Sequence, residues 1–215
     1  PEYKNIADIG CGYGRLLPSY NDDDKKITLI DPSNDLLEKA KDLYFDLDNV
    51  SYKCSSVQKL KKIKPRSFDL VLMIRVLHHV EDLDEAFSNL NRILKPNGYL
   101  ILEFANKMHG KDQIKNMLSG NFTFPLDIFP TDKRSDKNIK NDSISFLNHH
   151  PDIVIETLKD KKFSILDMRS VSNFRHNIFK KNLSINNLMI FEKLVQRPFA
   201  SFHFGPSMFV LCKKV

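Results

Sequence analysis

A glycine-rich turn near the start of this 215-residue chain constrains its fold more than any other feature. Residues 6–9, apolar apart from Asp8, read as a short buried strand, and the turn follows at once. Glycine lets backbone N–H groups approach a ligand with no Cβ in the way. The turn contains three glycines: Gly10, Gly12 and Gly14. A second apolar run, residues 27–30, ends in Asp31, whose carboxylate can accept hydrogen bonds from both hydroxyls of a ribose. This order of strand, glycine turn, helix and acid predicts a nucleoside-binding site.

The spacing of the glycines indicates which nucleoside. A dinucleotide fingerprint, G-x-G-x-x-G, would require glycine at a position that Arg15 occupies. The third glycine is instead Gly14, and Asp8 stands two residues before the first. This Asp-x-Gly-x-Gly-x-Gly pattern resembles motif I of the class I S-adenosylmethionine-dependent methyltransferases. The alternative is a tight turn without a ligand, and Asp31 argues against it.

The composition limits the classes of protein to which this chain can belong. The length suits one domain with a full core, and 41% apolar and 28% charged residues are ordinary for a globular protein. No apolar run approaches the length of a membrane span, so no membrane partner is expected. Three scattered cysteines, Cys11, Cys54 and Cys212, form neither a zinc pattern nor a disulfide framework. No metal is therefore expected, and a reducing cytoplasm is the expected compartment.

The net charge of +6 and the pI near 9.1 permit attraction to nucleic acid without requiring it. The densest basic run, residues 59–64, is more simply a solvated face than a contact with nucleic acid.

Along the chain, segments that read as strands alternate with segments that read as helices, which predicts a mainly parallel sheet with right-handed crossovers. The expected strands are residues 6–9, 27–30, 50–54, 68–74, 99–104, 163–171 and 207–212. One helix is expected to begin after Ser33, which serves as its N-cap. Three further helices are expected over residues 83–94, 152–161 and 183–195. In residues 95–98, Lys-Pro-Asn-Gly, proline presets φ and Gly98 would take the positive φ of a turn.

The alternation breaks at residues 105–150, which carry prolines, aromatics and a charged stretch. This segment is too long for an ordinary connection. It is either a substrate lid or a partly disordered insertion, and we favour the lid because Phe122, Phe124 and Phe129 need burial.

Further motifs follow motif I in the family's order. Residues 68–72, Phe-Asp-Leu-Val-Leu, resemble the family's fourth strand. Residues 76–80, Val-Leu-His-His-Val, and residues 92–98, Arg-Ile-Leu-Lys-Pro-Asn-Gly, resemble the segments after it. The chain thus resembles type 11 members of the class I methyltransferases, uncharacterised bacterial ones among them. The resemblance implies a single α/β domain over residues 1–215: a Rossmann-like, doubly wound, mostly parallel seven-stranded sheet with an antiparallel last strand and the lid after strand five.

Two positions depart from the family pattern. The family usually carries helices before the first strand that help to cover the cofactor, whereas this strand begins within the first few residues. That cover is therefore expected either to be missing or to lie outside this 215-residue sequence. The family often has an acid after strand three that binds the adenine amine, where this chain has Ser55 and Ser56. A hydroxyl accepts that hydrogen bond more weakly than a carboxylate.

The resemblance also implies roles for individual residues around S-adenosylmethionine. The glycine turn, with Cys11 and Tyr13 through their backbone, would bind the methionine half, and Asp8 would orient that turn. Asp31 would bind the ribose. The residues placed against the adenine or ribose are Pro32, Leu36, Ser55, Ser56 and Val57. Arg75, just beyond strand four, would pair with the cofactor carboxylate or an anionic substrate, or else form a surface salt bridge.

Candidates for a general base are weaker. His78 and His79 could include a general base, because a histidine side chain ordinarily titrates near neutral pH, but they more simply pack or cap the next helix. Of the pair, we take His79 as the one that faces the active site. Glu103 and His109 are lesser candidates.

The sequence predicts an S-adenosylmethionine-dependent methyltransferase (EC 2.1.1.-) that acts on a small molecule. An RNA methyltransferase, for example one that acts on tRNA, is the second hypothesis, although no RNA-binding module is evident. A non-catalytic cofactor-binding member is the third. The oligomeric state, the acceptor and the atom methylated stay open.

Overall fold

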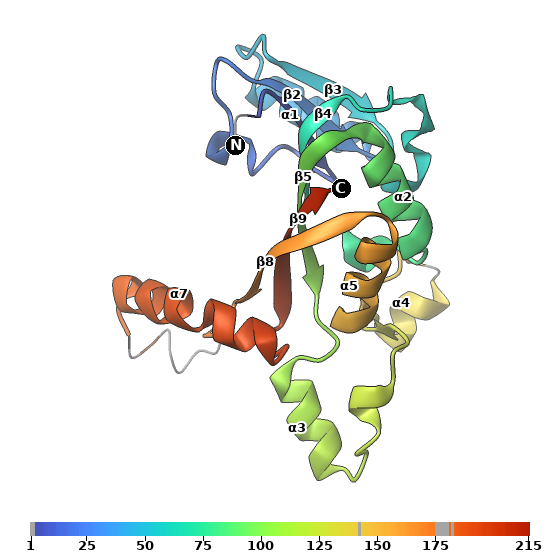
Figure 1. Ribbon diagram of the computed structural model, residues 1–215, viewed down its shortest axis with the longest axis vertical. Helices are drawn as coiled ribbons and strands as arrows, with labels where there is room; N and C mark the ends of the chain where they lie inside the picture. Colours follow the sequence, from blue (N-terminus) through green and yellow to red (C-terminus); the bar gives the residue numbers. More distant parts are fainter. Residues whose placement is uncertain (1–2, 142, 175–180, 182) are drawn as a thin grey trace.

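The fold is described from a computed structural model that places residues 3–141, 143–174, 181 and 183–215 (Figure 1). Its centre is one seven-stranded sheet with the strand order β3-β2-β1-β4-β5-β9-β8. The strands are β1 Asn5–Ile9, β2 Lys26–Asp31, β3 Val50–Cys54, β4 Phe68–Met73, β5 Leu94–Ala105, β8 Phe163–Val171 and β9 Ser207–Lys214. All pairs from β3 to β5 are parallel, whereas β9 pairs antiparallel with both β5 and β8. The predicted fold class is confirmed.

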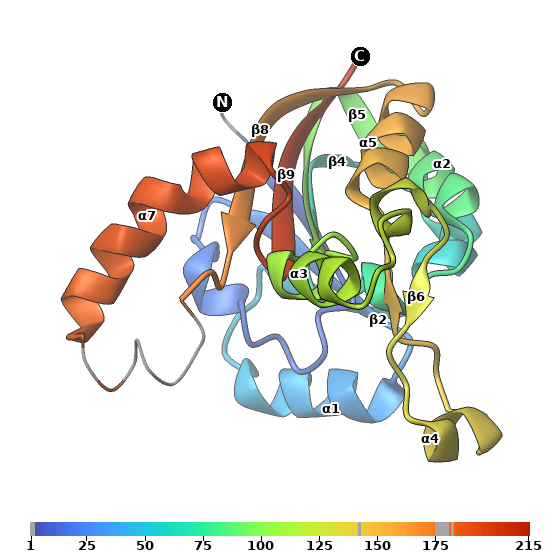
Figure 2. The same cartoon turned by 90° about the horizontal axis from the view of Figure 1, so that it is seen from below.

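Helices cover both faces of the sheet (Figures 1 and 2). One face packs on α1 and the 3-10 helix η1, through a core that includes Leu17, Leu29 and Leu37. The other packs on α2 and α5, through a larger core that includes Phe87 and Val154. The elements of these two layers are η1 Leu17–Ser19, α1 Asn34–Leu43, η2 Val57–Lys62, η3 Leu77–His79, α2 Leu83–Ile93 and α5 Pro151–Asp160.

Local sequence sets where these helices begin. Ser33 accepts a hydrogen bond from the backbone N–H of Leu36 and so caps α1, as predicted. Asp82 caps α2 in the same way through the N–H of Glu85. Because these caps come directly after β2 and after η3, α1 and α2 start at the carboxyl edge of the sheet.

The insertion carries its own short elements. They are α3 Gly110–Leu118, η4 Phe124–Leu126, β6 Thr131–Asp132, α4 Asp136–Lys140 and β7 Leu147–Asn148, with β6 and β7 antiparallel. Both of its ends stay near the sheet, because Asn106 bridges to His149 and the N–H of Lys107 donates to the carbonyl of His149. The insertion therefore leaves β5 and returns beside it. Of the three phenylalanines expected to be buried, Phe122 and Phe129 are exposed, so that expectation is wrong for these two.

Two local expectations are also wrong in detail. The positive φ near the start of β5 belongs to Asn97, at +62°, and not to Gly98. A Cβ on Gly98 would instead lie 2.9 Å from the carbonyl oxygen of Lys95, so this glycine serves close packing. The last helix, α7, runs over Ile185–Ser201 and continues through Pro198. Ala200, two residues after this proline, is buried in the core.

Candidate functional site

The glycine turn lies at the carboxyl end of β1. Gly10, Gly12 and Gly14 have φ of +69°, +57° and +79°, a region that favours glycine. A Cβ on Gly10 would clash with Val76, and one on Gly14 would meet the ring of Tyr44 at 2.8 Å. A Cβ on Gly12 would meet nothing within 4 Å. Gly12 thus leaves bare backbone facing open space.

Asp31 closes the other side of this turn. Its Oδ2 accepts the N–H of Gly12 at 2.8 Å, and its Oδ1 accepts the N–H of Ser33 at 2.9 Å. The side chain is only 6% exposed. Each carboxylate oxygen keeps a further lone pair after one hydrogen bond, so Asp31 can still accept from two ligand hydroxyls. The acid is thereby fixed in place before any ligand binds.

Asp8 is a buried acid beneath the same turn. Burial raises its pKa from 3.8 to about 6, the hydrogen bond from Tyr20 opposes that rise, and the nearby charge of Asp31 adds to it. The hydroxyl of Tyr20 donates to Oδ2 of Asp8 at 2.5 Å. Asp8 therefore ties the segment around η1 to the end of β1, consistent with the predicted role of orienting the turn.

Two adjoining cavities open at this edge of the sheet. The first, of about 290 Å³, is lined by the turn and by Leu36. The second, of about 470 Å³, extends toward β5 and β9. Four residues line both cavities: Arg15, Leu16, Ile74 and Arg75. The carboxyl edge where the strand order diverges is where ligands bind in open α/β sheets, so the pair of cavities is the candidate site.

Glu103 is the buried acid of the second cavity. Its Oε2 accepts the backbone N–H of Arg75 at 2.7 Å, and its Oε1 accepts the hydroxyl of Ser207. Burial raises the pKa of Glu103, although the Arg75 N–H and charge oppose this. Arg75 itself has φ of +62°, an uncommon backbone conformation for a residue with a side chain. The bond to Glu103 helps to hold that conformation at the border of the two cavities.

The two adjacent histidines have rings in contact, with centroids 4.1 Å apart, but they differ in burial. His78 lines the second cavity, 8% exposed, with its ring centroid 4.4 Å from that of Phe146. Burial, then His79 and Arg75, lower the pKa of His78 to about 4, so it is neutral at pH 7. His79 is exposed, is not among the residues that line either cavity, and has Nδ1 2.7 Å from the carbonyl oxygen of Ser145. The expectation that His79 faces the site is therefore replaced by His78.

Most residues predicted to surround the adenine lie outside the two cavities. Pro32, Ser55, Ser56 and Val57 line neither cavity. The hydroxyl of Ser55 donates to the carbonyl of Lys59 at 2.9 Å, and the side chain of Val57 is buried in the core. Val57 could meet a ligand only through its backbone.

Cys11 and Tyr13 line the first cavity together with the three residues Asp8, Gly10 and Gly12. Burial raises the pKa of the Cys11 thiol, with Asp8 and Asp31 adding to the rise, so Cys11 stays a neutral thiol there. Cys11 thus offers backbone and a small apolar side chain and no nucleophile.

Arg15, Leu16 and Ile74 were not predicted from the sequence, and Glu103 was given little weight. Their positions relative to the glycine turn and to the strand ends could have identified them. Arg15 and Leu16 directly follow the last glycine of the turn, and Ile74 and Glu103 lie at or just beyond the carboxyl ends of β4 and β5. His109, the other lesser candidate, precedes α3 in the insertion and lines neither cavity.

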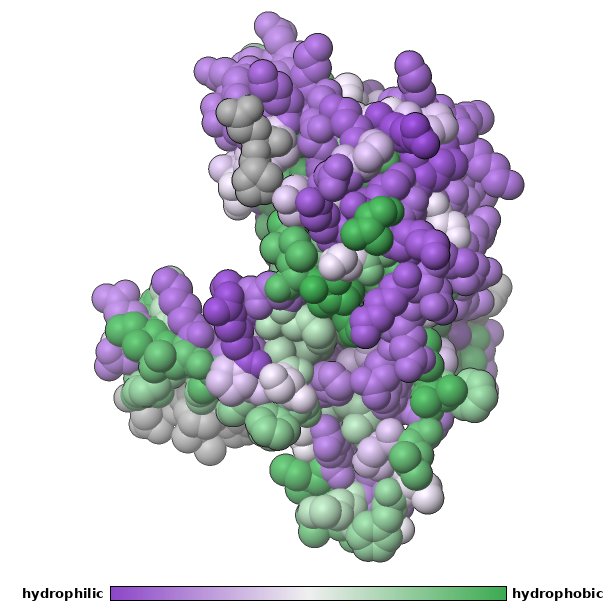
Figure 3. Space-filling model, viewed as in Figure 1, coloured by the Kyte–Doolittle hydropathy of each residue, from purple (hydrophilic) through white to green (hydrophobic). Residues whose placement is uncertain are grey.

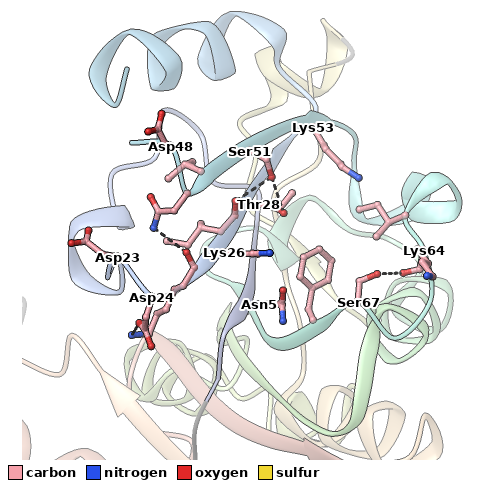
Figure 4. A pocket seen from close by; sticks show the side chains of 16 residues that line it. Asn5, Asp23, Asp24, Lys26, Thr28, Asp48, Ser51, Lys53, Lys64 and Ser67 are labelled. Carbon is pink, nitrogen blue, oxygen red and sulfur yellow. Dashed lines mark hydrogen bonds and ion pairs between the residues drawn. The ribbon is translucent and has the colours of Figure 1, made fainter. Parts of the chain in front are cut away.

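A larger cavity, of about 660 Å³, lies elsewhere (Figure 4). It includes Asn5 and Lys26, the first residues of β1 and β2, and the hydroxyls of Thr28 and Ser51, which lie 3.0 Å apart. Charged residues of both signs line it, among them the lysines Lys53 and Lys64 and several aspartates. Because it extends from the amino ends of the strands and excludes the glycine turn, it is not the candidate site.

Within the described ranges, no group of three or more His, Cys, Asp or Glu side chains could hold a metal ion. None of the helices in the described part of the chain is long and apolar enough to span a membrane.

A family model described as a methyltransferase domain matches residues 7–102. Among curated proteins, the chain is similar to the ubiquinone biosynthesis O-methyltransferase of Coxiella burnetii, at 27% identity over 124 residues. This match covers 57% of the chain and 52% of the relative. The corresponding protein of Bradyrhizobium diazoefficiens is 32% identical over 105 residues, 47% of the chain and 40% of the relative. The chain thus spans about half the length of the curated relatives it matches.

Solved structures resemble the whole chain. An S-adenosylmethionine-dependent methyltransferase from Mesorhizobium loti has a TM-score of 0.65 at 15% identity, over 99% of this chain and 91% of that one. A SAM-dependent methyltransferase from Methanosarcina mazei has a TM-score of 0.63 at 20% identity, over 100% and 94%. At these identities the likeness shows the fold.

Proposed function

We propose that the chain is a class I S-adenosylmethionine-dependent methyltransferase and that it transfers a methyl group from this cofactor to a small molecule. The match of residues 7–102 to a methyltransferase domain and the fold shared with solved methyltransferases support this. The observation that carries the proposal is the pair of adjoining cavities with four shared lining residues. A transfer between two bound molecules requires such a common border, because the reacting atoms must be held in contact.

The residues of the first cavity fit the cofactor. Gly12 presents bare backbone to open space. Asp31 lines neither cavity, but it is bound to the N–H of Gly12 and has lone pairs to spare for two hydroxyls. We assign the glycine turn to the methionine half and Asp31 to the ribose. Leu36 supplies an apolar contact. For the adenine we keep the groups predicted from the sequence, which are Pro32, Ser55, Ser56 and the backbone of Val57.

The bound cofactor supplies an electrophilic methyl group on a sulfonium that is its own leaving group. The protein therefore mainly orients the acceptor and accommodates its proton. Glu103 and His78 are the two titratable groups of the second cavity that could accept this proton. Glu103 is the better candidate, since a raised pKa makes a carboxylate a stronger base, whereas a pKa of about 4 makes His78 a weak one.

The second cavity favours an acceptor with both apolar and anionic parts. Phe146, Phe209 and Val171 are apolar, and Arg15 and Arg75 carry positive charge at the border with the first cavity. The curated relatives are named O-methyltransferases of ubiquinone biosynthesis. A hydroxyl on a small, partly apolar acceptor is accordingly our proposal for the methylated group.

Calorimetric titration with S-adenosylmethionine and S-adenosylhomocysteine, with NAD as the control, tests the proposal first. We expect micromolar binding of both sulfur nucleosides and no response to NAD. Turnover on a panel of hydroxylated acids and phenols would then identify the acceptor class. Salt-sensitive binding of tRNA would favour the RNA hypothesis instead, and cofactor binding without turnover on any acceptor would favour a non-catalytic member.

A further inference from the structure

The insertion presents an apolar surface to solvent at the carboxyl edge of the sheet. We call residues 110–129 the lid arm. Its most exposed apolar side chains are Leu118, at 80%, and Leu126, at 78%. The large apolar residues exposed on this arm are Ile114, Met117, Leu118, Phe122, Leu126, Ile128 and Phe129. Figure 3 shows this apolar surface in green at the lower tip of the molecule.

A second apolar surface lies on α7, which extends away from the body of the molecule (Figures 1 and 2). Of its 17 residues, only Ala200 is fully buried. The large apolar side chains exposed on it are Ile185, Met189, Ile190, Phe191 and Leu194. Patches of this extent are uncommon on monomeric soluble proteins and mark interaction sites.

The lid arm and α7 are joined at their bases. The N–H of Gly110, where α3 begins, donates to the carbonyl of Phe204 at 2.8 Å, just beyond the end of α7. A Cβ on Gly110 would lie 2.4 Å from the ring of Phe204, so the contact is close. The side-chain amide of Asn106 donates to the carbonyls of His203 and Gly205 at 2.6 and 2.7 Å. The two apolar surfaces therefore belong to one structural unit.

The exposure of the lid arm is built in and does not come from a loose loop. Lys107, only 2% exposed, donates to the carbonyls of Asp127 and Phe129, both at 2.6 Å. It also pairs with the carboxylate of Asp127 at 2.8 Å and lies 5.6 Å from the ring centroid of Phe124. The backbone of the arm is thus fixed from the inside while its apolar side chains point outward.

The charges around these surfaces are predominantly positive. Lys111, Lys115 and Lys193 are exposed and have no ion pair within the part of the chain that the structure describes. The acids on the same two segments are already engaged. Asp112 pairs with Lys133, Asp127 pairs with Lys107, and Glu192 accepts from the backbone and side chain of Asn173.

We propose that the lid arm and α7 together dock on an anionic phospholipid surface, with their apolar side chains in the interface and these lysines at the head groups. Exposed apolar residues flanked by lysines are the combination that binds such a surface without spanning it. The expectation of no membrane partner rested on the lack of a span, which surface docking does not need. The second cavity reaches the base of this unit through Pro206, whose carbonyl accepts the N–H of Asn106. Docking would therefore place the acceptor cavity beside the lipid.

Vesicle co-sedimentation of the whole chain tests the proposal, with phosphatidylcholine vesicles that contain phosphatidylglycerol and with pure phosphatidylcholine vesicles. We expect binding to the anionic vesicles and a marked loss of binding to the neutral ones. Leu118→Gln, Phe122→Ser and Leu126→Gln combined should weaken binding about tenfold or more, since affinity scales with buried apolar area. Ile185→Ser, Ile190→Ser and Leu194→Gln combined should do the same.

Two further variants separate the contributions of apolar contact and of charge. Phe45→Ser, at an equally exposed phenylalanine just after α1, should leave binding unchanged. Lys111→Glu with Lys115→Glu should abolish the preference for anionic vesicles without removing any apolar group. No binding to either vesicle, or equal losses in the Phe45 variant and the lid-arm variant, would overturn the proposal. So would a stable dimer in sedimentation velocity that the lid-arm substitutions dissociate, which would assign the surface to a second copy of the chain.

Discussion

At the scale of single residues, the candidate site depends on carboxylates held by backbone N–H groups. Asp31 is fixed by Gly12 and Ser33, and Glu103 is fixed by Arg75. Asp31, at the end of β2, accepts from Gly12 in the loop after β1, and Glu103, near the end of β5, accepts from Arg75 in the loop after β4. Such cross-strand bonds order the two loops before a ligand arrives, which lowers the entropy cost of binding.

Asp31→Ala should weaken binding of S-adenosylhomocysteine about tenfold or more. Hydrogen bonds to a charged group each contribute roughly 1.5–3 kcal/mol, and the variant also frees the N–H of Gly12. Isothermal titration calorimetry measures the loss. Asp35→Ala, at an exposed acid in the first turn of α1, is the matched control. Unchanged affinity in the Asp31 variant, with an intact circular dichroism spectrum, would refute the ribose assignment.

Asp8 should make stability depend on pH. Because its pKa is raised from 3.8 to about 6 in the folded protein, the folded state binds the proton more tightly than the unfolded state. The stabilisation is complete below pH 4 and is lost as the pH rises through 6, by up to about 3 kcal/mol. Asp8→Asn keeps an acceptor for the hydroxyl of Tyr20 and removes the titration.

Urea unfolding of both proteins between pH 4 and pH 7 checks this. The free energy of unfolding of the native chain should fall relative to that of the Asp8→Asn variant as the pH rises. Two parallel pH profiles would contradict the raised pKa.

At the scale of elements, the lid arm depends on a lysine that it covers. Lys107 provides donors for two backbone carbonyls near the end of the lid arm. A buried cation of this kind needs all its partners, since an unpaired one costs several kcal/mol. The arm and Lys107 therefore order each other.

Lys107→Met should loosen the lid arm and leave the sheet intact. The carbonyls of Asp127 and Phe129 would lose their donor, which costs about 1–3 kcal/mol where the group stays buried. Hydrogen exchange should show faster exchange over residues 121–130 and unchanged exchange in β1 and β4. Lys111→Met, at an exposed lysine of the same arm, is the control. Equal protection of the arm in all three proteins would show that Lys107 does not hold it.

How far the sequence predicts the elements depends on how local their causes are. The strands and the start of α1 follow from apolar periodicity and from the cap Ser33, and both are confirmed. The long-range contacts of the insertion could not be predicted, because burial of Lys107 depends on a chain reversal some 20 residues away. The choice between His78 and His79 failed for a similar reason, since the burial of His78 beside Phe146 depends on a segment far along the chain.

At the scale of the whole molecule, the site follows from strand order. β1 has β2 on one side and β4 on the other, so the loops after these strands separate and leave space at the carboxyl edge. The first cavity lies at the end of β1 and the second extends toward β5 and β9. Motif order in the sequence predicts this topology well, whereas the acceptor cavity draws on residues from both halves of the chain.

Ligand binding should stabilise the whole fold. S-adenosylhomocysteine at a hundredfold excess over its Kd adds about 2.7 kcal/mol to the free energy of unfolding. For a chain of this length that corresponds to a rise in Tm of roughly 5–10 °C. Scanning fluorimetry measures the shift, with NAD at the same concentration as the control. An equal shift with both nucleosides would count against a site specific for the sulfur nucleoside.

The position of β9 between β5 and β8 has a consequence for synthesis on the ribosome. β8 leaves the ribosome before β9, the strand that it pairs with in the sheet. Until β9 emerges, β5 has an open edge and β8 has no hydrogen-bonded neighbour, so a nascent chain exposes two strands at once. Exposed strand edges invite pairing with other chains, and this interval is therefore when the protein most needs a chaperone.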